Sequence, residues 1–287
     1  MHSSRLKSKI FLDGGDPDET REMKALLGFL DGQTTNPTLI SKNPEAKIRM
    51  ERGEKFTKKE LLGFYRAVVQ EISRIIPEGS VSVEVYADKN TGADEMFAQG
   101  KEMFSWIPNA HIKFPITKEG LAAAECATKD GMRVNMTLCF TQEQAAAVYA
   151  ATQGAVKGQV FVSPFVGRLD DRGENGMQLI ENIVRMYQNG DGHVEVLTAS
   201  VRNLNHFLYA LKLGSDIITS PGKLIREWTE QGMPVPDNDY DYYARELQPI
   251  VYQGLDLKKP WQEFDISHPL TDQGIEKFSD DWNALLQ

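Results

Sequence analysis

Short apolar runs alternate along this chain with longer stretches in which apolar residues recur at helical spacing. The apolar runs predict strands over residues 9–14, 33–37, 81–87, 111–116, 133–140, 160–166, 195–200 and 216–220. Helical spacing predicts helices over residues 18–30, 58–76, 93–106, 118–129, 142–152, 176–187 and 203–213. Alternation of this kind is typical of a parallel sheet with helices on its outside.

Eight strand–helix units fit a closed (β/α)8 barrel of the TIM type, an α/β fold, better than an open doubly wound sheet. The chain carries no Gly-x-Gly-x-x-Gly turn, which would favour the open sheet. We therefore expect a single barrel domain over residues 1–287.

Polar residues near the carboxyl ends of the strands are the candidates for function, because the chemistry of such barrels lies at that end. Seven expected strands end with one, and two arginines follow: Asp13, Asn36, Glu84, Lys113, Thr137, Ser163 and Ser200, then Arg168 and Arg202. The eighth strand, which ends in Thr-Ser-Pro, offers no residue that we single out.

Lys113 is the most informative of these residues because it lies in the apolar run His-Ile-Lys-Phe-Pro-Ile. Removing a lone cation from water is costly, and burial favours the neutral amine, which attacks carbonyl carbons. Taken alone, the position is better explained by a lysine that reaches the surface or pairs with a carboxylate. The polar residues at the other strand ends reverse that preference.

Composition narrows the classes of partner. With a net charge of −9, the chain has no global attraction for nucleic acid or an anionic membrane. No run approaches the roughly 18 apolar residues of a membrane span, and residues 1–9 do not form a secretory signal. Cys126 and Cys139 are expected to be reduced, in a cytoplasmic protein. The five histidines form no ligand pair, so we expect no metal site.

Six motifs stand in order at the expected strand ends. They are FLD at 11–13, TTNPT at 34–38, HIKFP at 111–115, VNMTL at 134–138, VSPFVGR at 162–168 and ASVR at 199–202. Together they resemble the transaldolase family, from about residue 9 to residue 228 and again from residue 268 to residue 282. Each motif alone is weak, but six in order are highly specific.

The resemblance implies a class I lysine enzyme that needs no metal or organic cofactor. Lys113 would form a Schiff base with a ketose phosphate, and the iminium would act as the electron sink when the carbon–carbon bond breaks. The retained dihydroxyacetone unit would then attack an aldose phosphate. Expected substrates are fructose 6-phosphate or sedoheptulose 7-phosphate with erythrose 4-phosphate or glyceraldehyde 3-phosphate, in the pentose phosphate pathway.

The same resemblance assigns roles to the other polar residues, and each has a plainer alternative. Asp13 would be the general acid/base, or a carboxylate in a Gly-rich turn. Glu84 would act through a water held by Thr137, or simply pair with the lysine, and Thr137 is also an ordinary strand residue. Asn36 would bind hydroxyls of the ketone unit, although asparagine before proline is also common in turns.

The two arginines are expected to bind phosphate, since guanidinium groups clamp it bidentately. Ser200 would add a hydroxyl, and Ser163 would position substrate or amine. Arg168 precedes Leu-Asp-Asp-Arg and could be salt-bridged at the surface, so Arg202 is the firmer assignment.

Two other functions remain open. Relatives of transaldolase make or cleave fructose 6-phosphate without transfer, and they tend to carry glutamine and tyrosine where this chain has Glu84 and Phe165. Both residues favour the transferase, because a phenylalanine cannot protonate the enamine. A non-catalytic sugar-phosphate-binding barrel is the alternative from another class.

Two segments follow the eight units. Residues 231–266 form an insertion rich in Pro, Asp and Tyr, which could cover the pocket, contact a second subunit or lie along the barrel. In the closing segment 268–287, residues 274–286 predict an amphipathic helix. The resemblance suggests that this helix closes over the barrel or reaches a neighbour, and we expect a homo-oligomer.

Overall fold

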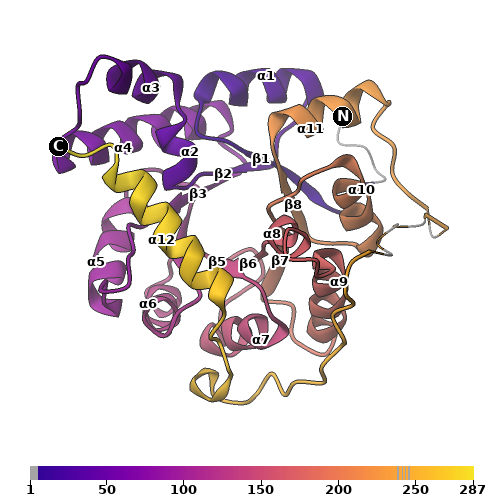
Figure 1. The fold of residues 1–287 in the computed structure, drawn as a ribbon. Helices are drawn as coiled ribbons and strands as arrows, with labels where there is room; N and C mark the ends of the chain where they lie inside the picture. Colours follow the sequence, from indigo (N-terminus) through magenta and orange to yellow (C-terminus); the bar gives the residue numbers. More distant parts are fainter. Residues whose placement is uncertain (1–5, 238, 241, 243, 245) are drawn as a thin grey trace.

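The chain folds into a closed barrel of eight parallel strands in sequence order, which confirms the expected (β/α)8 fold (Figure 1). The computed structural model describes residues 6–237, 239, 240, 242, 244 and 246–287. The strands are β1 Lys9–Asp13, β2 Gly32–Thr34, β3 Ser80–Glu84, β4 Ala110–Pro115, β5 Val134–Cys139, β6 Val160–Pro164, β7 Val194–Thr198 and β8 Ile217–Ser220. Each pairs only with its sequence neighbours, and β1 closes the barrel against β8.

Helices surround this barrel, and the seven that helical spacing predicted are present. They are α1 Pro17–Leu27, α4 Lys58–Ile75, α5 Ala93–Phe104, α6 Lys118–Lys129, α7 Gln142–Ala151, α9 Gly176–Tyr187 and α10 Leu204–Leu213. In α4, for example, a capping box of Thr57 and Glu60 begins the helix, and Tyr65, Val69 and Ile72 form its buried stripe. Among helices in the described ranges, none is long and apolar enough to span a bilayer.

Four further helices in the barrel region were not expected: α2 Pro37–Ser41, α3 Pro44–Glu51, α8 Val166–Asp170 and α11 Gly222–Glu230. Two of them begin at Asn-Pro pairs, which resemble turns in sequence. The side chains of Asn36 and Asn43 accept hydrogen bonds from backbone N–H groups of the next turn, and each proline takes the first helical position. Asn-Pro therefore acts here as a helix start.

The register of the barrel brings the polar strand ends together. Glu84 on β3 lies opposite Lys113 on β4, and Lys113 lies opposite Asn135 on β5. At the same edge, Leu138 and Ser200 have left-handed backbones, with φ of 62° and 58°. Non-glycine residues adopt this conformation at a cost, and such positions cluster at functional sites.

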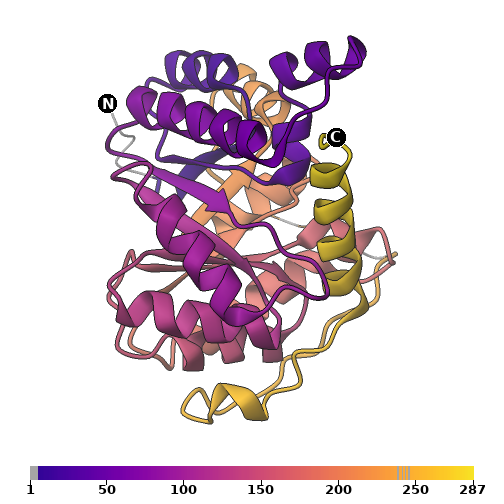
Figure 2. The ribbon, with the colours of Figure 1, turned by 90° about the vertical axis from the view of Figure 1, so that its left-hand side faces the viewer.

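The described residues of the insertion 231–266 lie along the outside of the barrel (Figures 1 and 2). Side-chain hydrogen bonds from Asn182 on α9, Gln142 on α7 and Gln153 reach its carbonyl groups at Ile250, Val251 and Leu257. Among its described residues, one short helix is present, the 3-10 turn Trp261–Glu263. Within the described residues, none of the insertion lines the pocket that holds the polar strand ends.

The closing helix α12 spans Pro269–Asn283 and crosses one end of the barrel (Figure 1). It starts earlier than the apolar spacing indicated, because His268 caps it and Pro269 takes the first helical position. Thr271 donates a hydrogen bond of 3.0 Å to the carbonyl of Leu138. The helix therefore covers the carboxyl ends of the strands.

Candidate active site

A pocket of about 340 Å³ opens at the carboxyl ends of the strands, beside α12. Eight of the ten residues singled out from the sequence line it: Asp13, Asn36, Lys113, Ser163, Phe165, Arg168, Ser200 and Arg202. Glu84 lies behind Lys113 and lines a small recess under α12, while Thr137 is fully buried next to that recess on β5. The expected residues therefore converge on one place.

Lys113 is 3% exposed and forms a buried ion pair. Its Nζ lies 2.8 Å from Oε2 of Glu84 and donates a hydrogen bond of 3.2 Å to the carbonyl of Thr35. The contact with Glu84 is within ion-pair distance but lacks hydrogen-bond alignment. Oε2 of Glu84 therefore accepts no hydrogen bond from the described residues. The plainer reading of Glu84, as the partner of the lysine, is thus present in the structure.

Burial perturbs both carboxyl groups near this amine. Desolvation raises the pKa of Glu84, and the charge of Lys113 opposes that rise without cancelling it. Desolvation also raises the pKa of Asp13, against a hydrogen bond from Thr34 and the charge of Lys113. Carboxyl groups with raised pKa values in a pocket are suited to holding and releasing protons.

Asp13 is oriented by a chain of hydroxyl groups that the sequence reasoning missed. The hydroxyl of Thr34 donates to Oδ1 of Asp13 at 2.7 Å and also lies 2.6 Å from the hydroxyl of Thr219. A hydroxyl has one proton to donate, so Thr219 donates to Thr34. Thr219 lies near the carboxyl end of β8, and that position was the signal that could have identified it.

The position of Asn36 fits both of its interpretations, as a residue of a local turn and as a ligand-binding residue. Its Oδ1 caps α2 by accepting from the N–H of Leu39 at 2.9 Å. The cap does not use Nδ2, which donates to none of the described residues. Because Asn36 also lines the pocket, its amide can serve both the local turn and a ligand.

A second buried chain crosses the barrel below the lysine. Ser163 donates to Asn135 at 2.6 Å, and Asn135 donates to Ser82 at 3.0 Å. Asn135 was missed, although it lies two residues before Thr137 on β5 and so faces the same side of the strand. The buried hydroxyl of Thr137 has no hydrogen-bond partner among the described residues.

The two arginines are placed differently from expectation. Arg202 forms the surface ion pair that seemed possible for Arg168: its Nη2 lies 2.8 Å from Asp171, with about half of its side chain exposed. Arg168 is more buried, and desolvation together with the charge of Arg202 lowers its pKa. A Cβ at Gly167 would lie 2.4 Å from atoms of Arg202, so this glycine makes room for that side chain.

The remaining lining residues add polarity and an apolar wall. Ser200 and Phe165 line the pocket beside the arginines, together with Lys42, Lys277 and Phe278, which were not singled out. In the described part of the chain, no three His, Cys, Asp or Glu side chains are grouped so that they could hold a metal ion. The charged side chains that line the pocket are Asp13, Lys42, Lys113, Arg168, Arg202 and Lys277.

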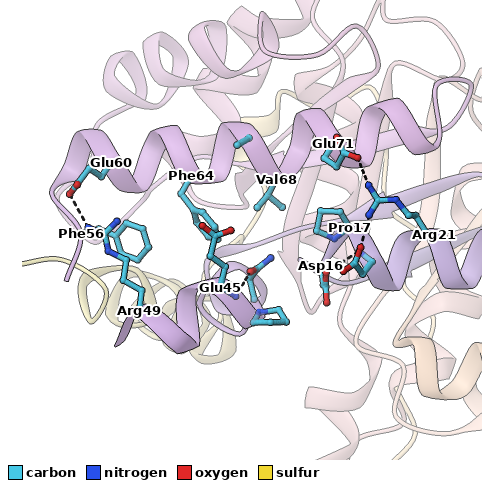
Figure 3. A pocket seen from close by; sticks show the side chains of 14 residues that line it. Asp16, Pro17, Arg21, Glu45, Arg49, Phe56, Glu60, Phe64, Val68 and Glu71 are labelled. Atoms are coloured by element: carbon cyan, nitrogen blue, oxygen red, sulfur yellow. Dashed lines mark hydrogen bonds and ion pairs between the residues drawn. The ribbon is translucent and has the colours of Figure 1, made fainter. Parts of the chain in front are cut away.

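A larger groove of about 640 Å³ lies on the outer wall between α1, α3 and α4 (Figure 3). Its arginines are already paired, Arg21 with Asp18 and Glu71 and Arg49 with Glu60. None of the residues singled out from the sequence lines it. Volume alone therefore does not identify the site, and the smaller pocket is the one that the candidate residues line.

Fold and pocket define the class: a (β/α)8 barrel with a buried lysine in a pocket that basic side chains line at the carboxyl ends of the strands. The sequence profile of the Transaldolase/Fructose-6-phosphate aldolase family matches residues 10–287, and the chain belongs to this family. The expected family resemblance is thus confirmed.

Relatives named probable transaldolase agree with this assignment. One from Dehalococcoides mccartyi is 35% identical over 96% of this chain and 99% of its own length. Others from Thermoanaerobacter sp. and Brucella anthropi are 37% and 36% identical, over 96% of both chains in each case. These names indicate a transaldolase-type enzyme, while the family itself includes both transferases and aldolases.

Proposed function

We propose that this protein is a transaldolase that transfers a dihydroxyacetone unit between sugar phosphates through a Schiff base on Lys113. The observation that carries the proposal is the buried Lys113–Glu84 pair at 2.8 Å, at the base of a pocket that also contains Arg168 and Arg202. An amine in that position can reach the carbonyl of a ligand whose phosphate contacts the two arginines.

The first step needs a neutral amine. A proton passed from the ammonium of Lys113 to Glu84 converts two buried charges into two neutral groups, which burial favours. The amine then attacks C2 of a ketose phosphate, and loss of water gives the iminium. Glu84 can return its proton to the departing hydroxyl, with Thr137 holding a water between them.

The second step breaks the bond between C3 and C4. Asp13 takes the proton of the C4 hydroxyl, an aldose phosphate leaves, and the bonding electrons pass into the iminium to give an enamine on Lys113. The hydroxyl groups of Thr34 and Thr219 keep Asp13 in place for this transfer. Attack of the enamine on a second aldose phosphate reverses the step.

The substrates follow from this assignment. Donors would be fructose 6-phosphate or sedoheptulose 7-phosphate, and acceptors erythrose 4-phosphate or glyceraldehyde 3-phosphate, as in the pentose phosphate pathway. Arg168, Arg202 and Ser200 would hold the phosphate, while Asn36 and Ser163 would bind hydroxyl groups of the retained unit. The cytoplasmic location and the homo-oligomer remain predictions, the latter testable by native mass spectrometry.

A fructose-6-phosphate aldolase is the second candidate, and Phe165 is the observation that separates the two. Phe165 lines the pocket and has no acidic proton to give to the enamine. An enamine that is not protonated persists until an acceptor arrives, which favours transfer. Phe165→Tyr should therefore gain release of dihydroxyacetone from fructose 6-phosphate, and a variant without that gain would count against this account.

Borohydride trapping tests the main proposal. The protein is reduced in the presence of fructose 6-phosphate, with and without erythrose 4-phosphate, and its peptides are examined by mass spectrometry. A three-carbon adduct on Lys113, with sedoheptulose 7-phosphate formed only when acceptor is present, is the expected result. Adduct with steady release of dihydroxyacetone would indicate the aldolase. No adduct and no turnover would leave a sugar-phosphate-binding barrel.

A further inference from the structure

Two side-chain hydrogen bonds attach helix α12 to neighbouring parts of the pocket rim. Thr271 donates a hydrogen bond to the carbonyl of Leu138 near the end of β5, and Asp281 accepts a hydrogen bond from Thr38 on α2. Between these two attachments, Phe278 lines the pocket beside Arg168. One helix, distant in sequence from the strands, therefore supplies part of the wall next to an arginine.

Arg168 has an unusual environment for a guanidinium. In the described part of the chain it forms no ion pair within 4.0 Å and no hydrogen bond. Its guanidinium carbon lies 5.3 Å from the ring centre of Phe165 and 5.6 Å from that of Phe278. Two aromatic rings thus contact the guanidinium where a carboxylate usually would, and its N–H donors stay available to an anion.

Charge makes this arrangement receptive to an anion. Desolvation and, after it, the charge of Arg202 lower the pKa of Arg168, so the two guanidinium groups repel each other even though Arg202 is paired with Asp171. A phosphate between them would relieve that repulsion and accept hydrogen bonds from both. The rings can keep Arg168 in place without competing for its N–H groups.

The helix reaches this position because of a glycine. A Cβ at Gly274 would lie 2.9 Å from Nη1 of Arg168 and 2.5 Å from Cδ2 of Leu138. Any larger residue would press on both side chains, so Gly274 sets how closely α12 approaches the guanidinium. Phe278 lies one turn further along the same helix and is itself buried.

We propose that Phe278 is a positioning residue for Arg168, and that docking of α12 through it sets the affinity of the pocket for the phosphate group of the ligand. The nature of that ligand rests on the proposed function, but the positioning of Arg168 does not. Phe165 contributes the other ring from within the barrel, whereas Phe278 contributes its ring from outside the eight units.

The test compares Phe278→Leu, which keeps an apolar side chain but removes the ring, with Phe278→Trp, which restores a ring. Leu285→Ala is the matched control, since Leu285 is buried in the same closing segment and does not line the pocket. Binding of inorganic phosphate is measured by isothermal titration calorimetry, and the melting temperature of each variant is recorded. Phosphate titration needs no turnover, so it judges Phe278 even if the protein transfers no sugar.

We expect Phe278→Leu to weaken phosphate binding about tenfold, the size of a well-shielded cation–π contact. Phe278→Trp should remain within about threefold of the natural protein, and Leu285→Ala should lower the melting temperature without changing phosphate affinity. With active enzyme, the ratio of kcat/KM for glyceraldehyde 3-phosphate to that for glyceraldehyde should fall about tenfold in Phe278→Leu.

Three results would overturn the proposal. The first is a Phe278→Leu variant that binds phosphate like the natural protein. The second is a Phe278→Trp variant as weak as Phe278→Leu, which would mean that the ring has no part in the effect. The third is a natural protein that binds no phosphate at all at concentrations of tens of millimolar, on the order of a very weak anion site.

Discussion

The barrel holds a lysine–glutamate ion pair near each of its ends, and the two pairs differ in their contact with water. At the amino end of the strands, Lys9 donates to Glu195 at 3.0 Å, and the lysine side chain is 46% exposed. At the carboxyl end, Lys113 and Glu84 lie 2.8 Å apart, and each side chain is 4% exposed. The residue types are the same, but the solvation is not.

The difference bears on the role proposed for Lys113, because burial disfavours two separate charges. Lys9 keeps much of its hydration because nearly half of its side chain is exposed, although its partner Glu195 is buried. Two desolvated partners gain from becoming neutral together, which leaves an amine free to act as a nucleophile.

The surroundings agree with this contrast. The amino end is plugged by His111 stacked on Phe161 at 4.0 Å, while the carboxyl end has the pocket. The strained backbones of Leu138 and Ser200 also lie at the carboxyl end.

Replacing each lysine with methionine tests the difference between the two ion pairs most directly. Lys113→Met should abolish borohydride trapping and lower transfer activity by at least about 10⁴-fold, because the variant has no nucleophile. Lys9→Met should retain activity within about twofold, since the Lys9–Glu195 pair lies at the end of the barrel opposite the pocket. Coupled assays on the two variants measure both effects, and comparable losses would contradict the assignment of roles.

Asp13→Asn should lower kcat by about 10²–10⁴-fold, the range expected for loss of a general acid/base. The same variant should be more stable than the natural protein at pH 8. Burial raises the pKa of Asp13 above its usual 3.8, so the folded state disfavours the carboxylate at any pH above that raised value. The penalty vanishes once both states are protonated, so urea unfolding at pH 8 and pH 3 should show the gain only at pH 8.

Gly274→Ala should have a smaller effect on the carboxyl end. The added methyl group displaces the tips of Leu138 and Arg168, and we expect KM for phosphorylated acceptors to rise about fivefold, within the range for a shifted side-chain contact. Gly254→Ala in the insertion is the control, because nothing lies within 4 Å of its added Cβ. Steady-state kinetics measure KM for both variants. An equal rise in KM for Gly254→Ala would contradict the explanation through Leu138 and Arg168.

The smallest effect on activity is expected at the amino end, from His111→Gln. Burial lowers the pKa of His111 to about 3 from its usual 6.5. Between these values the unfolded chain binds a proton that the folded chain does not, so stability falls as the pH falls through this window. The variant should lose this slope, up to about 1.4 kcal/mol per pH unit. Unfolding free energies at pH 7, 5 and 4 measure it.

Much of this architecture could be predicted from local patterns. Strand β4, for instance, is an uninterrupted buried run, and Lys113 stands out in it because nothing else there is charged. The polar residues at the strand ends were found by position alone, since a parallel barrel gathers the carboxyl ends of all its strands.

Other features depend on contacts that no local pattern contains. That Arg202 and not Arg168 forms the surface ion pair reflects where Asp171 and α12 lie, which the residues next to each arginine do not indicate. Phe278 belongs to the apolar face of its helix in sequence, but its partner is decided by the docking of that helix through Thr271. Thr219 was not singled out, because its contact with Thr34 on another strand is not visible in the sequence.

The place of α12 in the chain has a consequence for biosynthesis. A ribosome delivers the residues of all eight strands before it delivers Phe278, so the barrel can close while the guanidinium of Arg168 still lacks one of its two rings. Nascent barrels would then hold the lysine in place but bind phosphate weakly. On the proposed roles of Lys113 and Phe278, reactivity toward sugar phosphates would be delayed until translation has passed the whole barrel, and docking of α12 would complete the site.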